Sequence, residues 1–507
     1  MRVVGSVILG AIILFALIFF DNVMRNFNWG FSSQETPAAL IKQETSFSKG
    51  LMAYNGGDYA AALEELIPLA EQGHSQAQSY LGLMYLTGRG VPQDEQAAIK
   101  WWSLAAEQGF IGAQYNLGQM YREGDGVPQD EQAAVKWYTL AAEQGHPQSQ
   151  TNLGLMYLTG RGVPQDEQAA IKWWSLAAEQ GVIGAQYNLG QMYREGDGVP
   201  QDEQAAVKWY TLAAEQGHPQ SQTNLGLMYL TGRGVPQDEQ AAIKWWSLAA
   251  EQGRAKAQYN LGLMYDYDDI SPTDELAAFN WFRLAAEQGH AYAQLNLGVM
   301  YSKGQGIFQD DQTAVKWYTL AAKQGVAEAQ YGLGQMYDNG RGVPQDEQAA
   351  VKWYRLAAEE GDADAQYNLA LKYDKGDGIP QDYQAAVKWY RQAAEQGHAR
   401  AQFNLGVMYS KGRGVPQDYQ AAVKWYQLAA EQGDAKAQSN LGTSYAKGEG
   451  VLPDNIYAHM WWNVSELSGD VLSSKNREII ATIMTPADIS AAQKLARECV
   501  AKNYKGC

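Results

Sequence analysis

The chain has 507 residues, and 46% of them are hydrophobic, including 16 Trp and 31 Tyr. This composition excludes a mostly disordered chain, and the length exceeds what a single hydrophobic core usually holds. Fifty-six acidic residues against 39 basic residues give a net charge of −17. A polyanion would be repelled by this charge, so we expect no nucleic-acid partner.

The N-terminus is an apolar segment. "VVGSVILGAIILFALIFF" runs from Val3 to Phe20 without a charged residue. A helix of this length spans about 27 Å, enough for a bilayer core, and the segment ends without the small-residue site at which a secretory signal is cleaved. It predicts a transmembrane anchor or uncleaved signal at residues 1–24 and a polar linker at residues 25–46. The alternative is a cleaved signal.

A 36-residue period runs through the rest of the chain. A Leu-Gly pair recurs from Leu81-Gly82 to Leu441-Gly442 without insertion or deletion, and Leu369-Ala370 replaces it once. A fixed period of this length predicts stacked supersecondary units. Residues 81–181 match residues 153–253 at every position but one, which indicates a tandem duplication of two units. A site inside this block would therefore exist twice, which favours a repetitive binding surface or a spacer over a single catalytic centre.

One unit is predicted to form two helices. In "AQYNLGQMY" (113–121) the apolar residues fall on one helical face, and "GDGVPQD" then interrupts the helix with Gly and Pro. Asp130 is the expected N-cap of the second helix, and Gly145 ends that helix. Small Ala and Gly residues accompany large Trp and Tyr residues in each unit, so we expect the two helices to approach closely.

The ends of the array differ from its middle. Residues 47–73 align with the later units as a degenerate first unit, and the regular array covers residues 74–465. Residues 466–507 are predicted to form C-terminal capping helices, with Thr485 as an N-cap and Asp488 completing a capping box. The predicted fold is therefore all-α, with about eleven helix-turn-helix units.

The repeated motif resembles a known family. The pattern A-x-A-Q-x-x-L-G-x-M-Y, followed by a Gly-rich loop, V-x-Q-D, and A-x-x-W-x-x-x-A-A-x-Q-G, resembles the Sel-1-like repeat family, a relative of the tetratricopeptide repeat whose L-G-x-x-Y signature is present in "NLGQMY". The resemblance implies a right-handed superhelical α-solenoid that acts as a scaffold or adaptor for other proteins. Some cysteine-rich members are credited with hydrolysing β-lactams, but they carry a Cys pair in nearly every unit, and this chain has two cysteines in all.

These observations give a functional hypothesis. We expect a non-enzymatic scaffold at the bacterial inner membrane, with a single N-terminal anchor and the array in the periplasm, or a secreted or periplasmic protein if the signal is cleaved. The expected partners are other proteins, namely envelope proteins and their extended segments, with no cofactor, metal or small-molecule substrate. A cell-wall-related enzyme or enzyme modulator, with β-lactamase-like or penicillin-binding activity, and a passive spacer are the alternatives.

The candidate partner-binding residues form a row that we call the Asn ladder. Tetratricopeptide domains that hold extended peptides often carry Asn at this position on the concave side, and a carboxamide can pair with a peptide backbone unit. The alternative is that each Asn bonds the loop of the adjacent unit and orders the stack. The ladder consists of Asn116, Asn152, Asn188, Asn224, Asn260, Asn296, Asn368, Asn404 and Asn440.

Other chemistry-bearing residues have simpler interpretations. Five of the six His follow a Gly between units and are interpreted as helix caps, and the Trp row is interpreted as core. The acidic loop at residues 266–274 is interpreted as a solvated, drifted loop rather than a cation site. Cys499 and Cys507 are too few for a metal site, but in an oxidising compartment they could form a disulfide that ties down the C-terminus, the alternative being two unpaired thiols.

Overall fold

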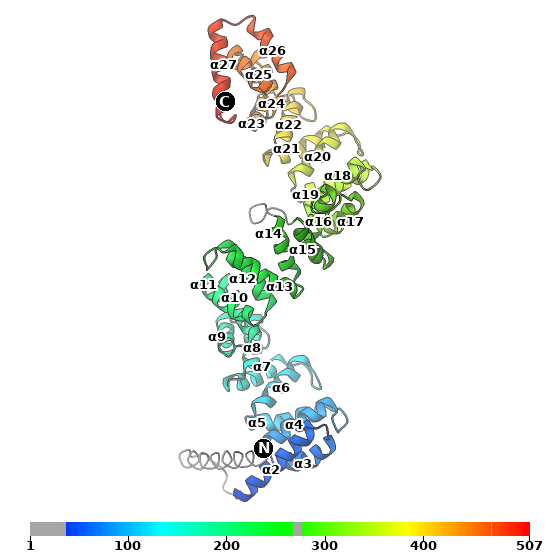
Figure 1. Cartoon of the computed structure of the whole chain (residues 1–507), viewed down its shortest axis with the longest axis vertical. Helices are drawn as coiled ribbons and strands as arrows, with labels where there is room; N and C mark the ends of the chain where they lie inside the picture. The colour runs from blue at the N-terminus through cyan, green and yellow to red at the C-terminus, as the bar shows by residue number, and fades with distance from the viewer. Residues whose placement is uncertain (1–36, 267–274, 468) are drawn as a thin grey trace, which may run out of the picture. The chain divides into compact units, whose positions relative to one another are not determined.

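In a computed structural model, residues 37–266, 275–467 and 469–507 are described, and the regular structure in these ranges is entirely α-helical (Figure 1). The chain divides into two units, residues 1–209 and 210–507, with the boundary inside helix α11 (Glu203–Glu215). Within each unit the second helix of a pair packs along the first, and the first helix of the next pair packs on the second. The predicted all-α solenoid of 36-residue helix pairs is confirmed.

The N-terminal unit begins with α2 (Pro37–Asn55) and ends within α11. In this unit α2 and α3 form the first pair, and each later pair consists of an even-numbered first helix and an odd-numbered second helix. Its other helices are α3 (Tyr59–Glu71), α4 (Ser75–Thr87), α5 (Glu95–Glu107), α6 (Ile111–Glu123), α7 (Glu131–Glu143), α8 (Pro147–Thr159), α9 (Glu167–Glu179) and α10 (Ile183–Glu195).

The C-terminal unit continues the same alternation and closes with three helices of its own kind, α25 to α27. Its helices after α11 are α12 (Pro219–Thr231), α13 (Glu239–Glu251), α14 (Ala255–Asp266), α15 (Glu275–Glu287), α16 (Ala291–Lys303), α17 (Asp311–Lys323), α18 (Ala327–Asn339), α19 (Glu347–Glu359), α20 (Ala363–Lys375), α21 (Tyr383–Glu395), α22 (Ala399–Lys411), α23 (Tyr419–Ala430), α24 (Ala435–Lys447), α25 (Asn455–Leu467), α26 (Val471–Ala481) and α27 (Pro486–Ala501).

The predicted caps set the helix boundaries. Asp130 Oδ1 accepts a hydrogen bond from the Ala133 amide at 2.9 Å, and the backbone carbonyl of Asp130 accepts the first bond of α7. Gly145 follows the C-terminus of α7 with φ of 88°, a conformation that favours glycine. These local signals recur in the other pairs whose caps are described, so the sequence alone places these helix ends to within a residue or two.

The Leu-Gly pair is explained by the contact between the two helices of a pair. A Cβ atom on Gly118 would lie 2.6 Å from ring carbons of Tyr138, and a Cβ atom on Gly82 would lie 2.5 Å from Nε1 of Trp102. Both aromatic side chains are almost completely buried. Only the absence of a side chain lets the first helix approach the ring this closely, so the expected close approach is confirmed.

A row of buried Gln side chains, which the sequence analysis missed, ties each pair together. Gln114 Nε2 donates to the carbonyl of Ala106 at 3.1 Å, and Gln114 Oε1 accepts from Gln144 Nε2 at 2.8 Å. A buried carboxamide is costly unless such partners satisfy it. We call this row the Gln ladder; it consists of Gln78, Gln114, Gln150, Gln186, Gln222, Gln258, Gln294, Gln330, Gln366, Gln402 and Gln438.

The helices at the two ends of the described chain differ from those of the regular repeats. Helix α2 begins at Pro37, so residues 37–46 belong to a helix and not to the predicted linker; Pro suits a first helical turn, and good helix formers follow it. At the other end α27 starts with the predicted capping box of Thr485 and Asp488. Its Ala492, Ala496 and Cys499 are buried against α25, as expected of a cap. A disulfide joins Cys499 to Cys507.

The predicted location requires a correction. In the described ranges, no helix has the length and the run of apolar residues that crossing a bilayer demands. The expected inner-membrane anchor with a periplasmic array is therefore not supported. The segment at residues 1–24 from which it was predicted lies outside the described residues, as does the acidic loop after Asp266.

Candidate functional site

Each member of the Asn ladder lies on the first helix of its pair and is half-buried. The Leu after each Asn and the Gln two residues before it point into the core, which leaves the Asn on the flank that faces the preceding pair. Asn404 Nδ2 donates to the hydroxyl of Tyr390 at 3.1 Å, and Asn368 Nδ2 donates to that of Tyr331 at 3.4 Å. Both hydroxyls belong to the preceding pair, so some Asn residues do link neighbours, through Tyr side chains rather than through a loop.

The aromatic residue 14 positions before each Asn is a Tyr in five repeats, and at Tyr390 the Asn that follows donates directly to its hydroxyl. In four repeats that residue is Trp102, Trp174, Trp246 or Phe282, none of which has a hydroxyl. The Asn residues that follow these rings make no hydrogen bond with the described residues, and their amides are not among the fully buried polar atoms. Within the described residues these amides therefore have no hydrogen-bond partner. They belong to Asn116, Asn188, Asn260 and Asn296.

The residue before each position of the Asn ladder, and before the equivalent Tyr80, varies with the buried ring of the second helix in its own pair, 23 residues later in the chain. Where the ring is Trp102, Trp174, Trp246 or Trp462, the first helix of that pair carries Ser or Thr, and the indole donates to its carbonyl, as Trp102 Nε1 does to Ser79 at 3.0 Å. Where the buried ring is smaller, a larger residue takes the place, namely Leu295 opposite Tyr318 and an aromatic residue elsewhere, as Tyr115 does against Tyr138 at 6.1 Å between ring centroids. A large indole is thus paired with a small Ser or Thr, and a smaller ring with a larger neighbour, so the volume that the two side chains fill in the core stays about constant. This pairing is visible in the sequence once the register is known.

The five His between units are helix caps, as predicted. His146 Nδ1 accepts from the Ser149 amide at 3.2 Å, and the imidazole lies 4.6 Å from the ring of Tyr115. An accepting Nδ1 requires the neutral ring, and burial lowers the pKa of His146, His218 and His290. His caps and Tyr rings thus form the wall beside the Asn ladder. The sixth residue, His459, is buried inside α25.

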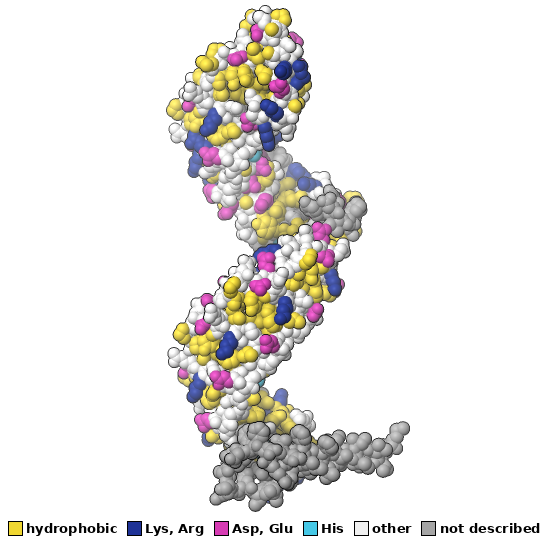
Figure 2. All heavy atoms as spheres, turned by 90° about the vertical axis from the view of Figure 1, so that its left-hand side faces the viewer, with side chains coloured by type: hydrophobic (Ala, Val, Ile, Leu, Met, Phe, Trp, Pro, Cys, Tyr) yellow, Lys and Arg dark blue, Asp and Glu magenta, His cyan; other side chains and the backbone are white. Residues whose placement is uncertain are grey.

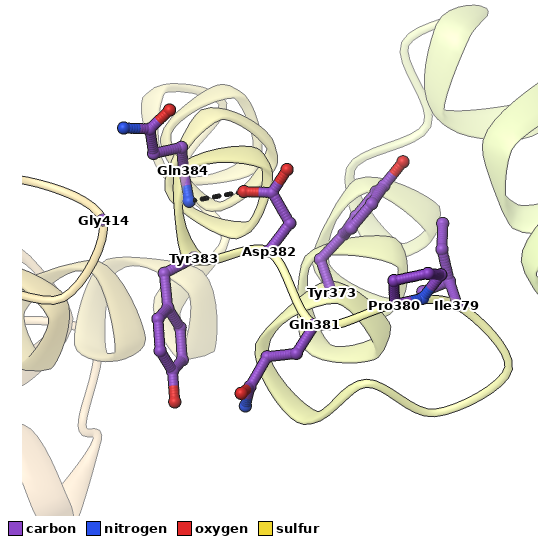
Figure 3. A pocket seen from close by; sticks show the side chains of 8 residues that line it. All are labelled: Tyr373, Ile379, Pro380, Gln381, Asp382, Tyr383, Gln384 and Gly414. Atoms are coloured by element: carbon purple, nitrogen blue, oxygen red, sulfur yellow. Dashed lines mark hydrogen bonds between the residues drawn. The ribbon is translucent and has the colours of Figure 1, made fainter.

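The surface hollows lie elsewhere. The hollow in Figure 3, of about 560 Å³, is formed at the loop between α20 and α21 with Gly414 of the next pair. Its carboxylate is already used, since Asp382 Oδ1 accepts from the amides of Gln384 at 2.9 Å and Ala385 at 3.0 Å. The V-P-Q-D motif produces the same hollow at other repeats. We interpret these hollows as a by-product of the repeated loop.

The second helices expose a recurring apolar row. Nine Leu side chains, each three residues after a Trp, are 36% to 44% exposed, as at Leu104 and Leu140. Hydrophobic side chains reach the face shown in Figure 2 as separate patches between charged side chains. The Trp residues beside them are partly buried against neighbouring cores, as predicted, and Lys136 Nζ lies 5.0 Å from the ring centroid of Trp137. No described residue covers this row.

No cluster suited to a metal was found among the described residues. Their ranges, 37–266, 275–467 and 469–507, contain no group of three or more His, Cys, Asp or Glu side chains that could hold an ion.

Comparisons with known proteins agree with the geometry. The model of the Sel1 repeat matches eleven consecutive segments between residues 75 and 465. The crystal structure of a protective antigen from uropathogenic Escherichia coli, which displays an SLR fold, is 39% identical, with a TM-score of 0.79, and covers 87% of this chain and 96% of its own. A Sel1 repeat protein from Oxalobacter formigenes is 36% identical, with a TM-score of 0.50, and covers 61% and 89%. The comparison with curated proteins returned no match.

Proposed function

This chain belongs to the Sel1 repeat family, and on that premise we propose that it is a non-catalytic scaffold that captures an extended segment of a partner protein along the Asn ladder. Repeat solenoids offer long surfaces of this kind for binding other proteins. The same side chains recur at a constant spacing, so the surface suits a ligand that is itself extended.

The observation that carries the proposal is the set of unpaired Asn amides. If the Asn ladder only ordered the stack, each of its side chains would be expected to bond a neighbouring pair, but those of Asn116, Asn188, Asn260 and Asn296 form no hydrogen bond with the described residues. A carboxamide has two donor hydrogens and one acceptor oxygen, which matches the amide and carbonyl of a backbone unit. Backbone pairing gives affinity with little demand on sequence, and neighbouring side chains add selectivity.

The test separates binding from stacking. A photo-crosslinking amino acid at position 188 is compared with one at position 240, an exposed position on α13, in living cells. The variant Asn116→Ala/Asn188→Ala/Asn260→Ala/Asn296→Ala is then compared with Asn404→Ala. We expect a discrete protein to crosslink only from position 188, and the fourfold variant to lose that protein while it melts like the wild type.

Asn404→Ala is the matched control, because Asn404 bonds Tyr390. It should lower stability by about 1 kcal/mol, the usual value of such a bond. Equal crosslinking from positions 188 and 240, or an unchanged partner in the fourfold variant, would contradict peptide capture and favour the spacer. Turnover of a β-lactam that is lost after one substitution would instead favour the enzyme.

A further inference from the structure

The Asn ladder of the C-terminal unit is bordered by a row of exposed charges. The second residue of each first helix changes from repeat to repeat although its neighbours hardly change. We call these residues the second-position row, and from α14 onward every member of it is exposed. From α14 to α24 the row consists of Lys256, Tyr292, Glu328, Asp364, Arg400 and Lys436.

The second-position row lies beside the Asn ladder and not on a remote surface. The ring of Tyr292 is 6.5 Å from that of Tyr259, which precedes Asn260 in the chain. Asp364 Oδ1 lies 3.2 Å from Nε2 of His398, and the ring of His398 stacks on Tyr367 at 4.7 Å. Tyr292 and Asp364 thus stand next to the Tyr and His side chains that wall the Asn ladder.

Electrostatics support the same placement. Burial raises the pKa of Tyr259, and Tyr292 and the negative charge of Glu328 add to the rise. Burial likewise raises the pKa of Tyr331, to which Asp364 adds. Charges on consecutive repeats therefore act on the wall of the Asn ladder.

The earlier repeats provide an internal contrast, because their second-position row carries no charge. All these repeats keep the same helices, caps and buried Gln residues. The difference lies at a position that is exposed or half-buried in the earlier repeats and exposed from α14 onward, where the fold imposes no requirement on charge. The uncharged members are Gln76, Gly112, Gln148, Gly184 and Gln220.

We infer that the C-terminal unit selects an extended protein segment with a basic centre and acidic residues on both sides of it. This inference rests on the proposed function and specifies its partner. Glu328 and Asp364 would face the basic centre, whereas Lys256 on one side, and Arg400 and Lys436 on the other, would face the acidic flanks. At physiological salt, exposed charges are screened beyond about 8 Å. Each charge of the row therefore interacts with the nearest residues of the bound segment and not with the net charge of the whole segment. Such complementarity gives selectivity more than raw affinity.

The test uses a library of random linear peptides selected on the purified full-length protein. We expect the enriched peptides to carry Lys or Arg in the middle and Asp or Glu on either side. Against the charge-reversal variant Glu328→Lys/Asp364→Lys, the basic centre should disappear from the enriched set, and a peptide selected on the wild type should bind about tenfold more weakly, as expected for two exposed pairs.

The matched control is Glu359→Lys/Glu395→Lys, which changes the net charge equally at exposed positions on the second helices α19 and α21. It should leave the enriched pattern and the affinity unchanged. Enriched peptides with no charge pattern, or with a pattern that survives the reversal, would overturn this inference and leave peptide capture intact. If no peptide is enriched, or if enrichment persists in Asn260→Ala/Asn296→Ala, the proposed function fails as well.

Discussion

Both units of the chain are built from the same 36-residue repeat, which is nearly unchanged in the N-terminal unit and altered at several positions in the C-terminal unit. In the N-terminal unit a block is almost an exact copy of its neighbour, with an uncharged second-position row and a complete set of Leu-Gly pairs. In the C-terminal unit Ala370 replaces a Gly, Lys372 replaces a Met, and Glu360 replaces a Gln. The helix pairs persist through these changes because caps and buried small residues define them. The comparison indicates that fold and partner selection are encoded at different positions of one repeat.

The largest expected effect comes from a buried ion pair found only in the C-terminal unit. Lys372 forms an ion pair with Asp338, with 10% and 25% of the two side chains exposed, and the hydroxyl of Tyr354 donates to Asp338 at 3.3 Å. Asp338→Ala would leave a nearly buried ammonium without a counterion. We expect a loss of about 2–3 kcal/mol in the free energy of unfolding, below the value for a fully buried pair because Asp338 is partly exposed.

The matched control introduces the residues that α16 carries at the equivalent positions, Met300 for Lys372 and Ser302 for Asp338. In α16 the hydroxyl of Ser302 bonds that of Tyr318 at 3.3 Å. The double variant Lys372→Met/Asp338→Ser should be at least as stable as the wild type in chemical denaturation. A double variant as unstable as Asp338→Ala would show that the ion pair is not the cause.

A second variant tests the close contact between the Gly of a Leu-Gly pair and the buried aromatic ring of the second helix, as found in the N-terminal unit. In Gly118→Ala the new methyl group would lie 2.6 Å from the buried ring of Tyr138, so the helices must separate. We expect a loss of about 2 kcal/mol, typical of overpacking, measured by chemical denaturation. Gly145→Ala serves as a comparison with open space around the new methyl group, although its positive φ carries a backbone cost of its own. Protease cleavage confined to the α6–α7 pair would locate the damage.

A third variant should stabilise the protein. Glu360 occupies the position at which other pairs have a Gln whose side-chain amide donates a hydrogen bond to a member of the Gln ladder. A carboxylate has no hydrogen to donate. Gln330 Oε1 is consequently buried without a partner among the described residues, whereas Gln294 Oε1 accepts from Gln324 at 2.8 Å. Glu360→Gln should raise the free energy of unfolding by about 1 kcal/mol. The neighbouring Glu359→Gln should not, and equal effects would point to net charge instead.

The smallest expected effect is a pH dependence that the His caps confer on their repeats. Burial lowers the folded-state pKa of His146, His218 and His290 below the ordinary value of 6.5. The folded state therefore binds fewer protons than the unfolded state. The caps' contribution is complete above pH 6.5 and is lost as the pH falls through the folded-state pKa.

Thermal melting at a series of pH values between about 8 and about 5 tests this dependence. The triple variant His146→Asn/His218→Asn/His290→Asn keeps an N-cap acceptor that does not titrate. Its melting temperature should fall less toward acid than that of the wild type. Parallel curves for the two proteins would assign the acid sensitivity to other groups.

Much of this architecture was predictable from local signals. The Leu-Gly pair, the Asp130 cap and the Thr485 capping box act within a few residues along the chain, so the sequence alone determined the period, the helix pairs and their ends. The location at a membrane was predicted from a segment outside the described residues and is not supported by the helices that are described.

The tertiary structure decided which side chains meet across helices. Gln114 and Gln144 are 30 residues apart, and Asn404 and Tyr390 are 14 apart, and neither spacing is a helical neighbour in the sequence. These contacts depend on the tilt and register at which one helix rests on the next, which close packing of rings against Gly and Ala determines. The row of Asn residues was therefore visible in the sequence, but only the packed helices show which of its amides bond a neighbouring pair.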